Sequence, residues 1–254
     1  MSLFELKGKS AIVTGGGTGI GKGIALELAG AGANVALASR KRENLEKVAA
    51  EIRDLGREAL VIPTDICIPE QVDNMIEQTV GRFGRLDILV NNAGIGDALS
   101  GSKVEELPLD AWKATIELNL TGTFICCVAA AKVMIEQKSG KIVNISSCVG
   151  IDPFPRLSNY GAGKAGVINM TKSMAAEWAE HNINVNSISP GAIVTEKSHR
   201  NAARQAADGT PIPPLRLPGS PKDVGHLAVF LASEAASHIT GETFEIKGAN
   251  IRGY

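Results

Sequence analysis

The stretch Thr14–Gly21, with the sequence TGGGTGIG, most constrains the fold because it joins a predicted strand to a predicted helix through residues with almost no side chains. The apolar run Ser10–Val13 before it is typical of a buried parallel strand. After it, Ile20, Ile24 and Leu28 recur every four residues and predict one apolar helix face. Glycines let the backbone approach a ligand closely, and the free N–H groups of a helix N-terminus attract anions. The stretch therefore predicts a phosphate-binding loop.

Strand and helix patterns alternate from end to end, which favours βαβ units and a parallel sheet. We expect a single α/β domain over residues 1–254. The predicted strands are Ser10–Val13, Asn34–Ala38, Ala59–Ile62, Leu86–Val90, Lys141–Ile145, Ile183–Ile188 and Thr243–Ile246. The predicted helices include one marked by Leu45, Val48, Ile52 and Leu55, one opened by Pro69, and helical regions over 109–137, 160–181 and 221–232. Between residues 194 and 220 the periodicity fails, which is typical of a substrate lid.

Composition excludes several classes of partner. The formal net charge is -1, which gives no basic surplus for nucleic acid or an anionic membrane. No apolar run approaches the roughly 20 residues of a membrane span, and the N-terminus lacks the apolar core of a signal peptide. We therefore expect a soluble cytoplasmic protein with no membrane and no nucleic-acid partner.

The cysteines and histidines show no metal-binding spacing. Cys67, Cys126, Cys127 and Cys148 contain no C-x-x-C pair, and the four histidines form no H-E-x-x-H cluster. We expect reduced cysteines and no metal site.

The end of the second predicted strand bears on the choice of cofactor. Dinucleotide folds place an acidic residue there for a ribose hydroxyl, or an arginine for a 2′-phosphate. Here Ser39 takes the place of the acid, and Arg40, Lys41 and Arg42 follow. Three cations at a helix start oppose the helix dipole, an effect that a bound phosphate would reverse. The pattern favours NADP(H) and leaves NAD(H) open.

Tyr160 and Lys164 suggest acid–base chemistry. Their four-residue spacing places the phenol and the ammonium on one helix face. A nearby cation favours the phenolate and lowers the pKa of a tyrosine from about 10 toward the range useful for catalysis. Ser147 follows the fifth predicted strand and so lies at the carboxyl edge of the sheet, where open α/β folds bind ligands. Its hydroxyl could hold a carbonyl oxygen while Tyr160 supplies a proton.

Six motifs in order make the chain resemble the short-chain dehydrogenase/reductase family over essentially its whole length. They are T-G-x-x-x-G-x-G at Thr14–Gly21, N-N-A-G at Asn91–Gly94, an active-site asparagine at Asn119, Ser147 thirteen residues before Tyr160, Y-x-x-x-K at Tyr160–Lys164, and P-G-x-x-x-T at Pro190–Thr195. The resemblance implies a Rossmann-type doubly wound parallel sheet of about seven strands flanked by helices, hydride transfer from a nicotinamide, and a homotetramer. The C-terminal residues Glu245–Asn250 depart from the glycine-rich ending of similar chains, which puts the details of substrate and assembly in doubt.

The resemblance also implies roles for individual residues. Asn119, Ser147, Tyr160 and Lys164 would be catalytic, with Asn119 holding a water for proton relay and Lys164 also binding the nicotinamide ribose. Asp65 would hydrogen-bond the adenine, Asn92 would help form the cofactor floor, and Thr195 would contact the carboxamide. The full set of cofactor-binding candidates is Gly15, Thr18, Gly19, Ile20, Gly21, Ser39, Arg40, Asp65, Ile66, Asn92, Ala93, Gly94, Tyr160, Lys164, Pro190, Gly191, Ile193 and Thr195. Ser146 fits the spacing to Tyr160 less well than Ser147.

The substrate hypothesis rests on two segments. Ile151, Phe154 and Leu157 offer an apolar wall after the fifth strand, and the lid carries the basic residues Lys197, His199, Arg200 and Arg204. Together they suit a small-molecule carbonyl or alcohol with an apolar acyl group and an anionic handle, such as a 3-oxoacyl thioester of coenzyme A or acyl carrier protein.

The sequence favours three other functions less. A sugar or polyol dehydrogenase of the gluconate or glucose type would need more hydroxyl partners than that loop offers. A catalytically silent NADP-binding regulator would not need the intact set Asn119, Ser147, Tyr160 and Lys164. A serine hydrolase is disfavoured because Ser147 is not in a G-x-S-x-G sequence, and Cys148 has no activating partner as a nucleophile.

Overall fold

A computed structural model describes residues 3–95, 102–196, 215 and 217–249. Within these residues one parallel sheet of seven strands has the order β3-β2-β1-β4-β5-β6-β7. The strands are β1 Ser10–Thr14, β2 Asn34–Ser39, β3 Ala59–Pro63, β4 Ile88–Asn91, β5 Gly140–Ile145, β6 Ile183–Pro190 and β7 Thr243–Ile246. All seven predicted strands are confirmed, although β4 begins two residues later than predicted.

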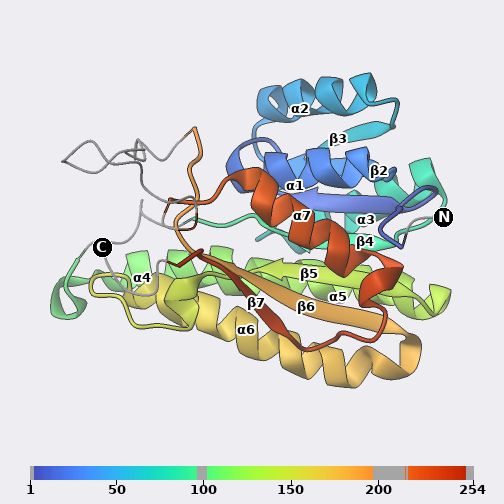
Figure 1. The fold of residues 1–254 in the computed structure, drawn as a ribbon. Coiled ribbons are helices and arrows are strands. Elements are labelled where there is room, and N and C mark those ends of the chain that lie inside the picture. The colour runs from blue at the N-terminus through green and yellow to red at the C-terminus, as the bar shows by residue number, and fades with distance from the viewer. Residues whose placement is uncertain (1–2, 96–101, 197–214, 216, 250–254) are drawn as a thin grey trace.

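Helices cover both faces of the sheet. They are α1 Gly19–Gly30, α2 Arg42–Asp54, α3 Pro69–Phe83, α4 Leu109–Ile116, α5 Gly122–Gln137, α6 Ser158–Trp178 and α7 Pro221–Ala232. Figure 1 shows α7, from the C-terminal part of the chain, lying beside α1 from the N-terminal part. The doubly wound α/β architecture predicted from the motifs is therefore confirmed.

The strand β1 shows why the sheet needs two layers of helices. Its side chains alternate between two cores: Ala11 and Val13 pack with α1, α2 and α7, whereas Ile12 packs with α3, α5 and α6. A strand buried on both faces has to be continuously apolar, as this one is. The same run that predicted a central strand therefore also accounts for its place in the middle of the sheet.

The strand order reverses on the two sides of β1, because β2 lies beside it in one direction and β4 in the other. At such a switch point the connections leave in opposite directions and open a crevice outside the carboxyl ends of the strands. The loops after β1, β4, β5 and β6 meet at this edge, and they carry most of the residues predicted for the site.

The helical region over 109–137 differs from the prediction in two ways. It is divided by a π-helical turn at Glu117–Thr121. The 29-residue region Leu109–Gln137 also contains an 18-residue window with a mean hydropathy of 1.7, so by length and composition alone it could cross a membrane. The expectation that no segment approaches this limit was therefore wrong. Half of the apolar window is buried inside the fold, where α5 contributes Cys126, Ala130 and Met134 to the core.

Two smaller differences concern helix ends. Leu55, taken as part of the apolar face of its helix, lies just after α2 and is exposed. The helix predicted over 160–181 begins earlier, at Ser158, and ends as a short 3-10 turn at Ala179–His181. Asn182 then adopts a positive φ of 56°, a conformation that ends the helical segment.

Candidate active site

The loop between β1 and α1 needs its glycines for backbone reasons. Gly15 and Gly19 have φ angles of +65° and +54°, in the region that favours glycine. At Gly21 a Cβ atom would lie only 2.2 Å from the carbonyl oxygen of Gly15. The first intrahelical bond runs from the N–H of Lys22 to the carbonyl of Thr18. The N–H groups of Gly19, Ile20 and Gly21 therefore precede the helical ladder and form the positive end of α1.

Asn92 and Thr14 join this loop to the end of β4. The Thr14 hydroxyl accepts hydrogen bonds from the N–H groups of Asn92 and Ala93, at 3.0 and 3.1 Å. The Asn92 amide donates to the carbonyls of Thr14 and Gly15, at 3.1 and 3.3 Å. Asn92 thus fixes the base of the glycine loop through its side chain, a contact across 77 residues that the N-N-A-G motif does not itself reveal.

The ends of β2 and β3 bring the cofactor-selecting candidates together. The Arg40 guanidinium is 68% exposed and lies 4.0 Å from an Asp65 carboxylate oxygen. Asp65 also accepts a hydrogen bond from the N–H of Cys67 at 3.1 Å. The Ile66 side chain is buried and packs beneath Gly122, so only its backbone could meet a ligand.

The segment after β6 returns to the glycine loop. Gly191 donates its N–H to the carbonyl of Ile246 at 2.8 Å. Ile193 pairs with Gly219 in an isolated bridge. A methyl carbon of Thr195 lies 3.4 Å from the position that a Cβ of Gly19 would take. The next residue, Glu196, accepts a hydrogen bond from the Gly19 N–H at 3.1 Å. Sequence reasoning missed Glu196, which lies 177 residues away along the chain.

Lys164 lies on α6 behind Tyr160. Its ammonium is fully buried, donates to the carbonyl of Ile145 at 2.9 Å and lies 5.7 Å from the centre of the Tyr160 ring. Burial lowers the pKa of Lys164 from 10.5 to about 8, because the charged form loses its hydration. The predicted juxtaposition of phenol and ammonium on one helix face is confirmed.

Ser147 and Ser146 differ in their surroundings. The Ser146 hydroxyl donates to the carbonyl of Ile188 at 3.1 Å and accepts from the Ser187 hydroxyl at 2.9 Å, in a buried polar cluster. The Ser147 hydroxyl accepts a weaker bond from the N–H of Val149 at 3.3 Å. Since Ser146 is engaged within the core, Ser147 is the better candidate for contact with a substrate.

Asn119 lies in the π turn and binds backbone groups. Its amide donates to the carbonyls of Ile95 and Thr115, both at 3.0 Å, and its oxygen accepts from the Ile95 N–H at 3.3 Å. These bonds fasten the loop after β4 to the helical layer. The proton-relay role implied by the resemblance stays a prediction, whereas the structure assigns Asn119 a loop-holding role.

Asn159, directly before Tyr160, is a second residue that sequence reasoning missed. Its buried side chain donates to the Thr115 hydroxyl at 2.9 Å and accepts from the Tyr160 N–H at 2.9 Å. It therefore links the start of α6 to α4 and helps to orient Tyr160. No sequence signal could have found it, because Thr115 lies 44 residues earlier.

The predicted apolar wall borders a hollow. A cavity of about 390 Å³ lies between the loop after β5 and the first turns of α6. Ile151, Phe154 and Leu157 line it together with Gly161 and Ala165. The same loop is tied to the C-terminal segment, since the Lys247 ammonium lies 3.9 Å from the Asp152 carboxylate and also contacts Glu245.

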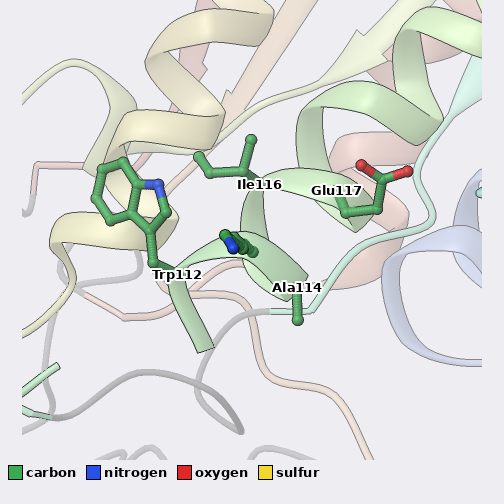
Figure 2. A pocket seen from close by; sticks show the side chains of 5 residues that line it. Trp112, Ala114, Ile116 and Glu117 are labelled. Carbon is green, nitrogen blue, oxygen red and sulfur yellow. The ribbon is translucent and has the colours of Figure 1, made fainter. Parts of the chain in front are cut away.

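A second hollow, of about 450 Å³, lies beside α4. Its walls are Trp112, Lys113, Ala114, Ile116 and Glu117, and Figure 2 shows these side chains projecting from one stretch of helix. None of them belongs to the predicted catalytic set. A single helical segment supplies all five residues, so this hollow lies along one side of α4 and the π turn.

The remaining predicted residues are the four cysteines and the basic residues of the lid. The four cysteines are free thiols, and burial raises the pKa of Cys148, which disfavours a nucleophilic thiolate. Among the residues that the structure describes, no three His, Cys, Asp or Glu side chains form a metal-binding group. The lid residues Lys197, His199, Arg200 and Arg204 lie outside the described ranges.

Comparison with known proteins agrees with this arrangement. The family model described as short chain dehydrogenase matches residues 9–206. The chain is 39% identical to a 3-oxoacyl-(acyl-carrier-protein) reductase of Synechocystis sp. over 251 residues, covering 98% of this chain and 99% of the relative. It is 40% identical to a reductase of the same name from Staphylococcus aureus strain Mu50, covering 94% of this chain and 97% of the relative.

Among solved structures, an NAD+-bound xylitol dehydrogenase is similar to this chain with a TM-score of 0.86 and 32% identity, over 96% of this chain and 99% of the other. Relatives of this similarity therefore include both 3-oxoacyl-(acyl-carrier-protein) reductases and a xylitol dehydrogenase. With a family match over most of its length and the motifs gathered at one sheet edge, the chain belongs to the short-chain dehydrogenase/reductase family and is an oxidoreductase that interconverts alcohols and ketones.

Proposed function

We propose that this protein is an NADP(H)-dependent reductase of a 3-oxoacyl thioester carried on acyl carrier protein or coenzyme A. The observation that carries this proposal is the apolar hollow lined by Ile151, Phe154 and Leu157 directly beside the helix of Tyr160 and Lys164. An acyl chain could be buried there with its carbonyl near the catalytic groups. The names of the two reductases at 39% and 40% identity support the same substrate class.

The residues at the sheet edge fit a nicotinamide dinucleotide. A Cβ at Gly21 would collide with the Gly15 carbonyl, so the backbone of the loop is tightly turned. Such a turn lets a pyrophosphate approach the backbone N–H groups closely. We propose that the dinucleotide is held by the loop 15–21 and by the ends of β2, β3, β4 and β6, including Asp65, Asn92 and Thr195. Lys164 would bind the nicotinamide ribose.

Arg40 supports NADP(H) over NAD(H). It follows β2 directly, at the position where an arginine can meet a 2′-phosphate. Its guanidinium is largely exposed, and its contact with Asp65 is a long one at 4.0 Å. Such a loose ion pair costs little to rearrange, so Arg40 is available to a phosphate.

The mechanism assigns one task to each residue. Hydride delivery to the carbonyl carbon is the chemistry that the bound nicotinamide supplies. Ser147 holds the substrate oxygen with its hydroxyl, and Tyr160 donates its phenol proton to that oxygen. The buried ammonium of Lys164 favours the resulting phenolate. In the oxidation direction Tyr160 accepts the proton, and the other roles are unchanged.

A polyol dehydrogenase is the second candidate. The similarity to an NAD+-bound xylitol dehydrogenase favours it, and so does Asp152, an acidic residue in the wall of the hollow. A carboxylate could accept hydrogen bonds from polyol hydroxyls. The apolar side chains Ile151, Phe154 and Leu157 favour the thioester instead.

We also propose a cytoplasmic homotetramer. The family resemblance implies this assembly, and exposed apolar side chains on α4 and α5, such as Trp112 and Phe124, give a surface that another copy could cover.

The deciding experiment compares initial rates of reduced-cofactor loss with NADPH and NADH on one 3-oxoacyl thioester, one keto sugar and one cyclic ketone. The proposal predicts the fastest turnover for the thioester with NADPH. Tyr160→Phe, which removes only the phenol hydroxyl, should lose about 10²- to 10⁴-fold in kcat. Preference for the keto sugar would support the polyol reading. If wild type and Tyr160→Phe were equally inactive on every substrate while still binding NADPH, a silent cofactor-binding protein would be favoured.

A further inference from the structure

The N-terminus of α1 is capped by a carboxylate from a distant segment. The Gly19 N–H donates to Glu196 at 3.1 Å. The first turn of α1 contains no acidic residue, and the N-cap residue Thr18 makes no side-chain cap hydrogen bond. Glu196 therefore supplies the negative charge that the helix dipole favours at this end.

The neighbouring contacts hold Glu196 in this position. Val194 donates its N–H to the carbonyl of Gly219 at 2.9 Å, and Gly219 donates to Ala192 at the same distance. Thr195 packs against the place where a Cβ of Gly19 would be. Because the backbone is paired just before Glu196, this residue is held within reach of the N-terminus of α1.

The same amide belongs to the loop that would receive the dinucleotide. Gly19 is one of the three residues whose N–H groups precede the helical ladder of α1. A carboxylate and a phosphate at this end of the helix would compete for the same donor and repel each other.

We propose that Glu196 is a built-in competitor of the cofactor's pyrophosphate, and that it lowers the affinity of the protein for dinucleotides. This inference rests on the proposed function, since it takes α1 as the dinucleotide-binding helix. In the cofactor-free protein Glu196 caps α1; when a dinucleotide binds, the pyrophosphate takes over the Gly19 N–H and the carboxylate moves into solvent. The contact lowers the affinity for NADPH and for NADH by the same factor, because it does not involve the 2′-phosphate.

The test is the dissociation constant of NADPH and of NADH, measured by fluorescence titration without substrate, for wild type and Glu196→Gln. We expect the variant to bind both dinucleotides about 2- to 5-fold more tightly, because the competing charge is worth about 0.3–1 kcal/mol at a helix end. The gain should shrink as salt is raised. In the cofactor-free state the variant should melt about 1–4 °C lower, since the helix loses its cap.

Two further variants separate the possible results. Glu180→Gln removes an exposed carboxylate at the opposite edge of the sheet and should leave both dissociation constants unchanged. Arg40→Ser should weaken NADPH alone. An equal decrease in the dissociation constants of NADPH and NADH in Glu196→Gln supports the proposal. Unchanged or weaker binding overturns it and leaves the proposed function intact, whereas a wild-type protein that binds neither dinucleotide overturns both.

Discussion

At the scale of single residues, Lys164 shows how catalysis and stability oppose each other. The ammonium is surrounded by protein and is offset by one carbonyl, that of Ile145, rather than by a carboxylate. Its lowered pKa of about 8 reflects the free-energy cost of burying the charged ammonium away from water. A chain selected for stability alone would place an apolar residue there.

This cost predicts a pH dependence of stability. Between pH 8 and 10.5 the unfolded chain binds more protons at Lys164 than the folded protein does. The buried ammonium therefore lowers the free energy of unfolding fully below pH 8, and this loss of stability decreases as the pH rises. Relative to Lys164→Met, the wild-type free energy of unfolding should therefore increase by about 1.4 kcal/mol per pH unit across this window. Urea unfolding of the cofactor-free proteins at several pH values measures it.

Lys172→Met is the matched control for this prediction, because Lys172 is an exposed lysine on the same helix. Its difference from wild type should not change with pH over the same window. A constant difference between wild type and Lys164→Met would contradict the assigned pKa.

At the scale of elements, the start and the end of α1 make different demands on glycine. A Cβ at Gly21 would lie 2.2 Å from the Gly15 carbonyl oxygen, whereas a Cβ at Gly30 would meet no atom within 4 Å. Gly21 is required because any side chain would collide with the Gly15 carbonyl, whereas Gly30 only reduces the helix propensity.

We therefore expect Gly21→Ala to destabilise the protein by about 1–3 kcal/mol and to weaken NADPH binding, because the loop backbone must shift. Gly30→Ala should be neutral or stabilising by up to about 1 kcal/mol. Urea unfolding and NADPH titration of both variants measure these effects. Equal behaviour of the two alanine variants would show that the loop can adapt.

The connection between the C-terminal segment and the substrate loop gives a second prediction at this scale. Lys247, directly after β7, bridges Asp152 and Glu245. Lys247→Gln should raise the KM for substrate about 2- to 5-fold, as expected for the loss of a surface charge contact of up to about 1 kcal/mol. The dissociation constant of the cofactor should not change.

Asp152→Asn is the partner variant. If the two residues act through their contact, the double variant should have the KM of either single variant rather than the product of both effects. Independent effects would instead assign Lys247 a direct role toward the substrate.

Sequence predictability also differs from element to element. The contact between Tyr160 and Lys164 was predictable because helical geometry fixes residues four apart. The π turn at Glu117–Thr121 was not, because a local widening of the helix leaves the apolar pattern of its surroundings intact. The links Asn159–Thr115 and Glu196–Gly19 depend on how separate elements pack, which local patterns do not encode.

At the scale of the whole molecule, the order of the strands could be inferred only through the family resemblance. Alternation of strand and helix predicts a parallel sheet, but it does not state that β4 lies beside β1. The apolar pattern of β1 is compatible with any central place in a sheet. The motifs supplied the missing information because the family that they indicate has a Rossmann-type sheet, in which the strand order reverses beside the first strand.

The apolar side chains left exposed on α4 and α5 predict an assembly. Leu109, Trp112 and Phe124 are exposed in the single chain. We expect a mass near four times 26.5 kDa in sedimentation analysis, and Phe124→Glu should shift the protein to smaller species because a buried charge without a partner is costly. Leu55→Glu alters an equally exposed leucine at the end of α2 and should leave the mass unchanged. A monomeric wild type would contradict the prediction.

The bridge between Ile193 and Gly219 bears on how a protein with this fold can acquire a new substrate. The bridge holds Ile193, just after β6, beside Gly219, just before α7, so the sequence between these two points can be exchanged as one module. Doubling the length of a flexible loop costs only about 0.6 kcal/mol. New substrates could thus be acquired by replacing this module, while the proton-transfer groups on β5 and α6 keep their register.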